Sequence, residues 1–257
     1  GQLHEETAAS DDNLLASGIF NTGNSGIILE KLNDYDYLMK KFYNVHPTTT
    51  ASRDLMQAET FLSTDLSIEK NADGPQILIY HTHGSEAYSQ SDGETYTESD
   101  AYRTTDCTHN VVRVGEEIAQ VLRAYGFQVI HDTELYDYPA YSGAYERSGA
   151  AVQRWLEQYP TIKLALDVHR DALVGKDGSI YKFITTENGQ RAAQVMLVVG
   201  AGHDGWKDNL ALAVRLQREL AADYVTLARP AVLRSGKYNQ DRLPGSLLVE
   251  VGGHGNT

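Results

Sequence analysis

The sequence predicts an α/β protein with three layers, in which helices cover both faces of a mostly parallel central β-sheet. Short apolar runs rich in β-branched residues alternate along the chain with helical patterns of ten or more residues. This alternation is typical of parallel strands joined by crossover helices. With 257 residues, a hydrophobic fraction of 41% and a charged fraction of 22%, the chain is long enough to bury a sizeable core.

Apolar runs predict five strands, and amphipathic stretches between them predict three helices. The first strand, Ile77–Tyr80, is apolar throughout, as expected for a buried strand. The first helix, Asn110–Ala124, repeats apolar residues at three- and four-residue spacing, and Gly126 follows it where a C-cap glycine belongs. The other predicted elements are the strands Phe127–His131, Lys163–Val168, Ala193–Val199 and Leu247–Val251 and the helices Gly143–Gln158 and Asn209–Tyr224.

Two segments are expected before the first strand. Residues 1–25 are rich in Ser, Asp, Asn and Gly without a sustained period, and we expect them to be flexible. Residues 26–74 space their apolar side chains as a helix does and are expected to form a short helical N-terminal appendage. The turn-forming sequence Asn71–Pro75 then marks the start of a main domain at residues 75–257.

Charge and cysteine content exclude several classes of protein. The formal net charge is -13 and the 22 basic residues are scattered, so nucleic acid is not an expected partner. Cys107 is the single cysteine, which rules out a disulfide within the chain and a cysteine-rich zinc site. Any metal must therefore be held by histidines and carboxylates.

The beginning of the chain indicates a fragment or a mature form. It has no initiator Met and lacks the basic and apolar regions of a signal peptide. No run of 18 apolar residues occurs, so no spanning helix is predicted within it. We expect a membrane anchor upstream of this sequence.

Imidazoles and carboxylates gather at the ends of three predicted strands. His83 and Glu86 follow the first strand, His169 follows Lys163–Val168, and Glu250 lies within the apolar last strand. Because ligands bind beyond the carboxyl ends of parallel strands, we expect these side chains to form one site. Two imidazoles and a carboxylate, with one position left for water, are typical of a hydrolytic zinc site.

Each residue receives a predicted role. His83 and His169 are assigned as nitrogen ligands of zinc and Glu86 as the third ligand. Glu250 is assigned as the general base, because an unpaired carboxylate is costly in an apolar strand that has no functional need of it. Arg170 is expected to help stabilise the oxyanion.

Several alternatives stay open. Asp106 or His109, at the start of the first helix, is an alternative third ligand, although helix capping explains both equally well. His81 lies two residues before His83, so in an extended chain the two side chains point the same way. We interpret His81 as either a ligand or a hydrogen-bonding partner of the ligands. Cys107 lacks the sequence pattern of a cysteine protease, which argues against a nucleophilic thiol.

Together these segments resemble the stage II sporulation protein P family. The resemblance runs from about Tyr35 to Thr257 and rests on a His-Thr-His motif and an Asp-x-His-Arg-Asp-Ala motif. The segments that carry it are Tyr37–Tyr43, Pro75–Tyr88, Leu166–Ala172, Tyr238–Asp241 and Leu248–Gly253.

The main domain is also distantly similar to zinc N-acetylmuramoyl-L-alanine amidases. His83, His169 and Glu250 match that pattern, and Arg147 matches a helical arginine of those enzymes. The middle ligand departs from it, since those amidases carry a Glu at the start of the first long helix. Here the helix start holds Asp106–Asn110 without a Glu, which leaves the third ligand between Glu86 and the helix-start residues.

The resemblance implies a zinc-dependent peptidoglycan hydrolase whose catalytic domain is residues 75–257. Such an enzyme removes stem peptides from muramic acid as an amidase and cuts peptide cross-links as an endopeptidase. The family implies a role in forespore engulfment, with stage II sporulation proteins D and M as partners. It also implies an extracytoplasmic location and a membrane anchor. The alternative functions are a zinc carboxypeptidase-like peptidase and a non-catalytic scaffold that binds the cell wall.

Overall fold

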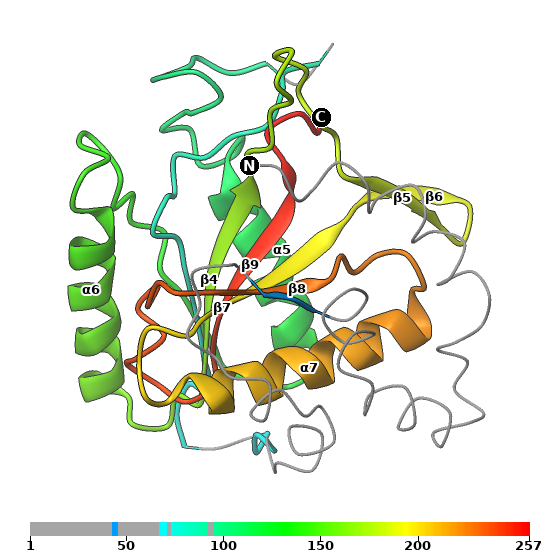
Figure 1. Cartoon of the computed structure of the whole chain (residues 1–257). Helices are drawn as coiled ribbons and strands as arrows, with labels where there is room; N and C mark the ends of the chain where they lie inside the picture. Colours follow the sequence, from blue (N-terminus) through cyan, green and yellow to red (C-terminus); the bar gives the residue numbers. More distant parts are fainter. Residues whose placement is uncertain (1–42, 46–66, 71–72, 92–94) are drawn as a thin grey trace.

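The computed structural model describes residues 43–45, 67–70, 73–91 and 95–257 and has the predicted α/β architecture (Figure 1). Within these residues, seven strands form one sheet in the order β1-β8-β7-β9-β4-β2-β3, and β5 and β6 form a separate hairpin. The strands are β1 Tyr43–Val45, β2 Ile77–Tyr80, β3 Val129–His131, β4 Leu164–Asp171, β5 Ile184–Glu187, β6 Gln190–Ala193, β7 Val195–Gly200, β8 Ala231–Arg234 and β9 Ser246–Gly253. The helices are α5 Val111–Ala124, α6 Ala144–Gln158 and α7 Trp206–Asp223.

Parallel pairing dominates the sheet, as predicted. Strands β3, β2, β4 and β9 run parallel to one another, and so do β1, β8 and β7. The two groups meet at β7 and β9, which pair antiparallel. Because β2, β4 and β9 share a direction, the residues at their carboxyl ends come to the same edge of the sheet.

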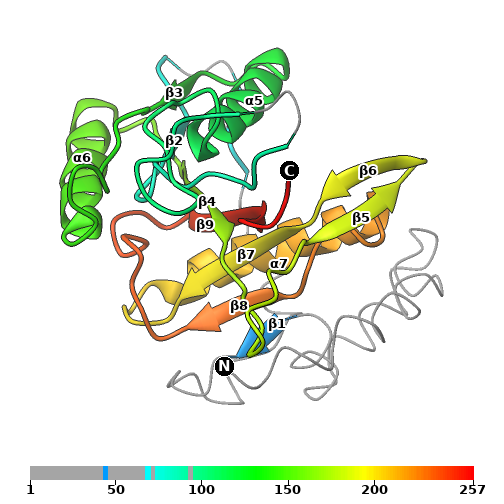
Figure 2. The ribbon, with the colours of Figure 1, turned by 90° about the horizontal axis from the view of Figure 1, so that it is seen from above.

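Helices cover the two faces of the sheet unequally. Side chains alternate along a strand, so Ile77 and Ile79 of β2 enter a large core with α5 and α7. Leu78 and Tyr80 enter a smaller core with α6 on the other face. Figure 2 shows α6 standing beside the end of the sheet that holds β2, while the β5–β6 hairpin projects at the opposite end.

On the face that carries α6, no described helix packs on the side chains of β7, β8 and β9. Four side chains from these strands form a small apolar cluster against Tyr238: Met196, Val198, Val232 and Leu248. Within the described residues, no helix contributes a side chain to this cluster. These side chains form an apolar floor on this face of the sheet.

Strand β4 is longer than predicted. The predicted strand ended at Val168, whereas β4 continues through His169 to Asp171. Its later residues pair with β9, with a register irregularity between His169 and Asp171. The polar side chains His169 and Arg170 are buried there together with a partner, since both contact the Glu86 carboxylate.

Four strands, β1, β5, β6 and β8, lie where the sequence analysis predicted none. The β5–β6 hairpin turns at Asn188 and Gly189, whose φ angles are 52° and 78°, the positive values that a two-residue hairpin turn needs. Strand β8 has only four residues, too few for a periodic pattern. Tyr43–Val45 forms β1 and pairs with β8, although it lies within the range predicted to be helical. The predictions for residues 1–42 and 46–66 fall outside the described residues.

No helix in the described part of the chain has the length and apolar character needed to cross a bilayer.

Helix α5 follows its predicted bounds closely. The side chain of Asn110 caps it by accepting a hydrogen bond from the Val112 N–H at 3.0 Å, and Gly126 follows with a φ of 93°, as a C-cap glycine does. On its buried side, Gly115 leaves room for two imidazoles. A Cβ atom there would lie 2.5 Å from His81 Cε1 and 2.8 Å from His131 Nε2.

We predict that Gly115→Ala lowers the free energy of unfolding. Alanine favours a helix by about 1 kcal/mol over glycine, but the added methyl group overpacks the imidazoles at a cost of roughly 1–3 kcal/mol. Chemical denaturation measures the net change. Glu117→Ala, at an exposed position of the same helix, is the matched control and should change stability little. A Gly115→Ala protein that is more stable than the wild type would show that the packing is not tight here.

Candidate functional site

A cavity of about 470 Å³ opens over the apolar floor at the carboxyl ends of β4 and β9. All five residues predicted for the site line it: His83, Glu86, His169, Arg170 and Glu250. Further polar and aromatic lining comes from Tyr141, Tyr145, Asp171, Arg229, Arg234 and Tyr238. The fold therefore brings the predicted residues together, and their chemical roles follow from the contacts they make.

His169 and Glu250 lie side by side on the sheet. They are register partners on the parallel strands β4 and β9, and paired positions place their side chains on the same face. Asp167 pairs with Leu248 one pleat earlier on that face. The pleat thus presents an imidazole next to a carboxyl group at the cavity.

Both ring nitrogens of His169 face carboxylates. Nε2 lies 2.9 Å from Asp167 Oδ1, close in distance although not aligned as a hydrogen bond, and Nδ1 lies 3.4 Å from Glu86 Oε2. Burial opposes a charged imidazole, but the two carboxylates outweigh it and raise the pKa of His169 well above its usual value. Without a metal, His169 is therefore a cation paired with Glu86.

The Glu86 carboxylate contacts two arginines as well as His169. Its Oε2 accepts a hydrogen bond from the Arg170 N–H at 3.2 Å, and Oε1 lies 3.6 Å from Arg103 Nη2. Burial alone would raise the pKa of Glu86, but its contact with His169 and the charge of Arg170 lower it to about 2. The side chain is ionised at neutral pH, as a metal ligand must be.

His83 reaches the cavity from the loop after β2. Its ring lies 5.4 Å from the ring of His169, centroid to centroid, and stacks on Tyr141 at 4.5 Å. Burial, together with the charge of His169, lowers the pKa of His83, so this imidazole is neutral. Its Nδ1 is buried, lies 4.0 Å from Asp137 Oδ2 and has no hydrogen-bond partner among the described residues.

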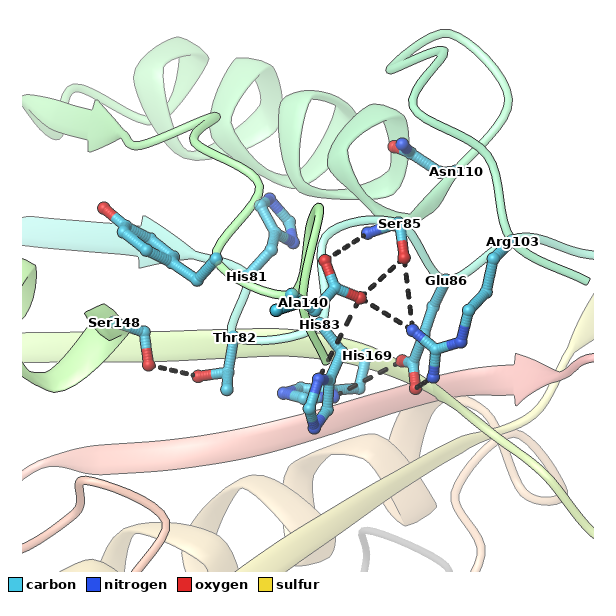
Figure 3. A network of polar contacts seen from close by, with 12 residues as sticks. His81, Thr82, His83, Ser85, Glu86, Arg103, Asn110, Ala140, Ser148 and His169 are labelled. Atoms are coloured by element: carbon cyan, nitrogen blue, oxygen red, sulfur yellow. Dashed lines mark hydrogen bonds and ion pairs between the residues drawn. The ribbon is translucent and has the colours of Figure 1, made fainter. Parts of the chain in front are cut away.

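Asp137 and Arg103 are site residues that the sequence analysis missed. The Asp137 carboxylate is buried and accepts hydrogen bonds from the Ser85 hydroxyl at 2.6 Å and from Arg103 Nη1 at 2.7 Å. Figure 3 shows Arg103 and Ser85 pointing toward each other near His83, where Arg103 Nη1 donates to the Ser85 hydroxyl at 3.2 Å. Both residues lie outside the predicted strands and helices, where no periodic pattern marks a functional side chain. The network fixes the loop that carries His83.

Glu250 is the most unusual carboxyl group of the cavity. The residue is half-buried, and its buried Oε2 has no hydrogen-bond partner among the described residues. Burial, reinforced by the negative charge of Glu86, raises its pKa to about 8. The group therefore gains or loses a proton near neutral pH, which suits a general base or acid.

Arg170 lines the cavity, but its polar groups contact the protein itself, including the Glu86 carboxylate. Its Nε donates to the Ala87 carbonyl at 2.8 Å and one Nη donates to the Tyr102 carbonyl at 3.0 Å. Its side chain thereby ties β4 to the loop after β2. The oxyanion role predicted for Arg170 stays a prediction.

His81 does not share the cavity with His83. Its Nδ1 lies 3.0 Å from the Val168 carbonyl oxygen and its Nε2 lies 2.9 Å from His131 Nε2. The expectation that both side chains point the same way assumed an extended chain, but β2 ends at Tyr80 and the chain turns. Figure 3 shows the two rings on different sides of the loop.

The helix-start candidates and Arg147 lie outside the cavity lining. His109 Nδ1 pairs with Asp106 Oδ2 at 2.9 Å, and both side chains are partly exposed. Arg147 donates to the backbone carbonyls of Tyr136 at 2.7 Å and of Ala140, which braces the loop that carries Asp137.

The donor set of the cavity suits zinc in its chemistry. The rings of His83 and His169 lie 5.4 Å apart, centroid to centroid, and the Glu86 carboxylate lies 3.4 Å from His169 Nδ1. Asp137 and Asp167 stand behind the two imidazoles, as carboxylates do behind zinc-bound histidines. Within the described residues, however, no three His, Cys, Asp or Glu side chains already converge as a metal site. The ligand set thus stays a prediction.

Comparison with known proteins gives one family. A model of the stage II sporulation protein P family matches residues 28–257. The chain is 28% identical over 200 residues to stage II sporulation protein P of Bacillus subtilis (strain 168), an alignment that covers 73% of this chain and 48% of that protein. The chain thus spans about half the length of this curated relative.

We predict that zinc binding to this site strengthens as the pH rises. His169 has a raised pKa, so its proton must leave before the nitrogen can bind a metal. The affinity should rise about tenfold per pH unit while one proton is released on binding. Zinc titrations from pH 6 to 8 measure this slope. An affinity that is independent of pH would show that His169 is not a ligand.

Proposed function

The chain belongs to the stage II sporulation protein P family, and we propose that it is a zinc-dependent peptidoglycan hydrolase acting in sporulation. Its proposed activities are N-acetylmuramoyl-L-alanine amidase and cross-link endopeptidase. We further propose that it works outside the cytoplasm during forespore engulfment. There its full-length form is anchored in the membrane and acts with stage II sporulation proteins D and M.

One observation carries this proposal. Glu250, with a pKa near 8, stands beside His169 on neighbouring parallel strands, and His83 and Glu86 line the same cavity. A carboxyl group that titrates near neutral pH beside two imidazoles is the combination that hydrolysis of an amide needs. A scaffold that only binds the cell wall would have no need to bury an unpaired carboxyl group.

His83, His169 and Glu86 are the residues that would hold zinc. When bound there, the ion would polarise the scissile carbonyl and make water acidic enough to lose a proton near neutral pH. Asp137 and Asp167 would keep the two imidazoles oriented, because each carboxylate stands behind one ring.

Glu250 acts as the general base and then as the general acid in the proposed reaction. In its ionised form it accepts a proton from the attacking water, and in its protonated form it delivers that proton to the departing amine. The apolar floor beside it, at Val198 and Leu248, accommodates the body of a peptide. Tyr141 also lines the cavity and stacks on His83.

The products distinguish this proposal from the carboxypeptidase alternative. An amidase releases intact stem peptides from purified cell wall, whereas a carboxypeptidase releases single amino acids. Mass spectrometry of the soluble products separates the two outcomes. Release of single amino acids alone would contradict the proposed bond specificity.

We predict that Glu250→Gln abolishes hydrolysis while the protein keeps its fold and its zinc. The amide cannot accept a proton, and loss of a positioned acid–base group costs typically 10²–10⁴-fold in rate. Release of stem peptides from purified peptidoglycan measures the activity, and metal analysis measures the zinc content.

Glu117→Gln, at an exposed position on α5, is the matched control and should retain full activity. Near-normal hydrolysis by Glu250→Gln would remove Glu250 from the mechanism. Loss of zinc together with activity would instead assign Glu250 to metal binding.

A further inference from the structure

Three arginines line the cavity. Two of them already bind other groups of the protein. The guanidinium of Arg170 donates to two backbone carbonyls. That of Arg229 pairs with Asp171 Oδ2 at 2.8 Å and lies over the Phe183 ring at 3.7 Å. Both guanidinium groups therefore already have partners within the protein.

Arg234 is the third arginine, and its position is different. Its Nε is buried without a hydrogen-bond partner among the described residues. Its charge lowers the pKa of Glu250, but no described carboxylate forms an ion pair with it. Leaving a buried charged donor unpaired costs free energy. A guanidinium that lines a cavity and whose buried Nε lacks a partner is suited to bind an acceptor group of a ligand.

The sheet places Arg234 at the opposite end of the apolar floor from Glu250. Val232 and Arg234 are two residues apart on β8 and share a face. Val232 pairs with Val198 of β7, which in turn pairs with Leu248 of β9. This apolar row lies between Arg234 and the end of the cavity that holds Glu250.

We propose that Arg234 binds a carboxylate of the stem peptide, carried by a residue that flanks the scissile amide. The inference rests on the proposed function for its substrate class. With the scissile bond at Glu250 and His169, the peptide lies across the apolar row and its carboxylate meets the guanidinium. The planar fork of arginine matches a carboxylate with two parallel hydrogen bonds.

The charge around the cavity favours a carboxylate over a phosphate. Glu86, Asp171 and Glu250 line the same cavity, and their repulsion acts more strongly on a doubly charged phosphate than on a singly charged carboxylate. A chain with a net charge of -13 also gains little affinity for an anion from long-range attraction. A local cation is therefore needed to hold an acidic peptide.

Matched ligands test the proposal. N-acetylmuramoyl-L-alanyl-D-glutamate and its diamide differ only in the charge of the two carboxyl groups. Calorimetry on chelator-treated protein measures the affinity for each without hydrolysis, and KM values are measured on the zinc-loaded protein. We expect the wild type to prefer the diacid by roughly 10- to 100-fold, the range for hydrogen bonds to charged groups.

Arg234→Met should bind diacid and diamide equally, because it keeps the apolar stem and removes the guanidinium. Arg234→Lys keeps the charge without the fork and should show an intermediate preference. Arg113→Met, at an exposed position on α5, is the control and should behave as the wild type. Thermal melting checks the fold of each variant, and Arg234→Lys tests the proposal should Arg234→Met not fold.

The outcomes separate this inference from the proposed function. Equal binding of diacid and diamide by the wild type, or a preference that survives in Arg234→Met, would overturn the carboxylate site. Hydrolysis without that preference would leave the proposed function intact. A clear preference without any hydrolysis would contradict the proposed function and leave the carboxylate site standing.

Discussion

The Asp167 carboxylate joins the two strands on which the site depends. Its Oδ1 accepts a hydrogen bond from the Thr82 N–H at 2.8 Å, and its Oδ2 accepts one from the Thr82 hydroxyl at 2.6 Å. The same Oδ1 lies 2.9 Å from His169 Nε2. Thr82 also contacts Ser148 of α6 at 2.8 Å. One buried side chain thus sets the turn that delivers His83, the orientation of His169 and the attachment of α6.

Burial then decides the charges of the site. Glu86 and His169 are stable as charged groups because they face each other, since a buried charge without a partner is far more costly. Glu250 has no such partner among the described residues, and its pKa rises to about 8. A divalent cation among these groups would favour the ionised form of Glu250 and the neutral form of His169. Binding of such a cation would therefore release protons from the site.

The sequence predicted the parts of the site that lie on regular strands. His169 and Glu250 could be placed together because parallel strands bring their carboxyl ends to one edge, and a carboxylate in an apolar strand stands out. Asp137 and Arg103 lie on irregular loops, where contacts depend on tertiary structure that no local pattern encodes. His81 was misplaced for the same reason, because the turn after Tyr80 depends on Asp167, 85 residues away from Thr82. The Asn188–Gly189 turn, in contrast, was a hairpin signal within the sequence itself.

The central claim is that one zinc ion joins His83, His169 and Glu86 at the edge of the sheet. A crystal structure of the zinc-soaked protein, with anomalous data collected on both sides of the zinc absorption edge, tests it most directly. We expect one anomalous peak in the cavity, within bonding distance of both imidazoles and of the Glu86 carboxylate, with Glu250 nearby and not bound to the ion. A peak between Asp106 and His109, or no zinc in the cavity, would contradict it.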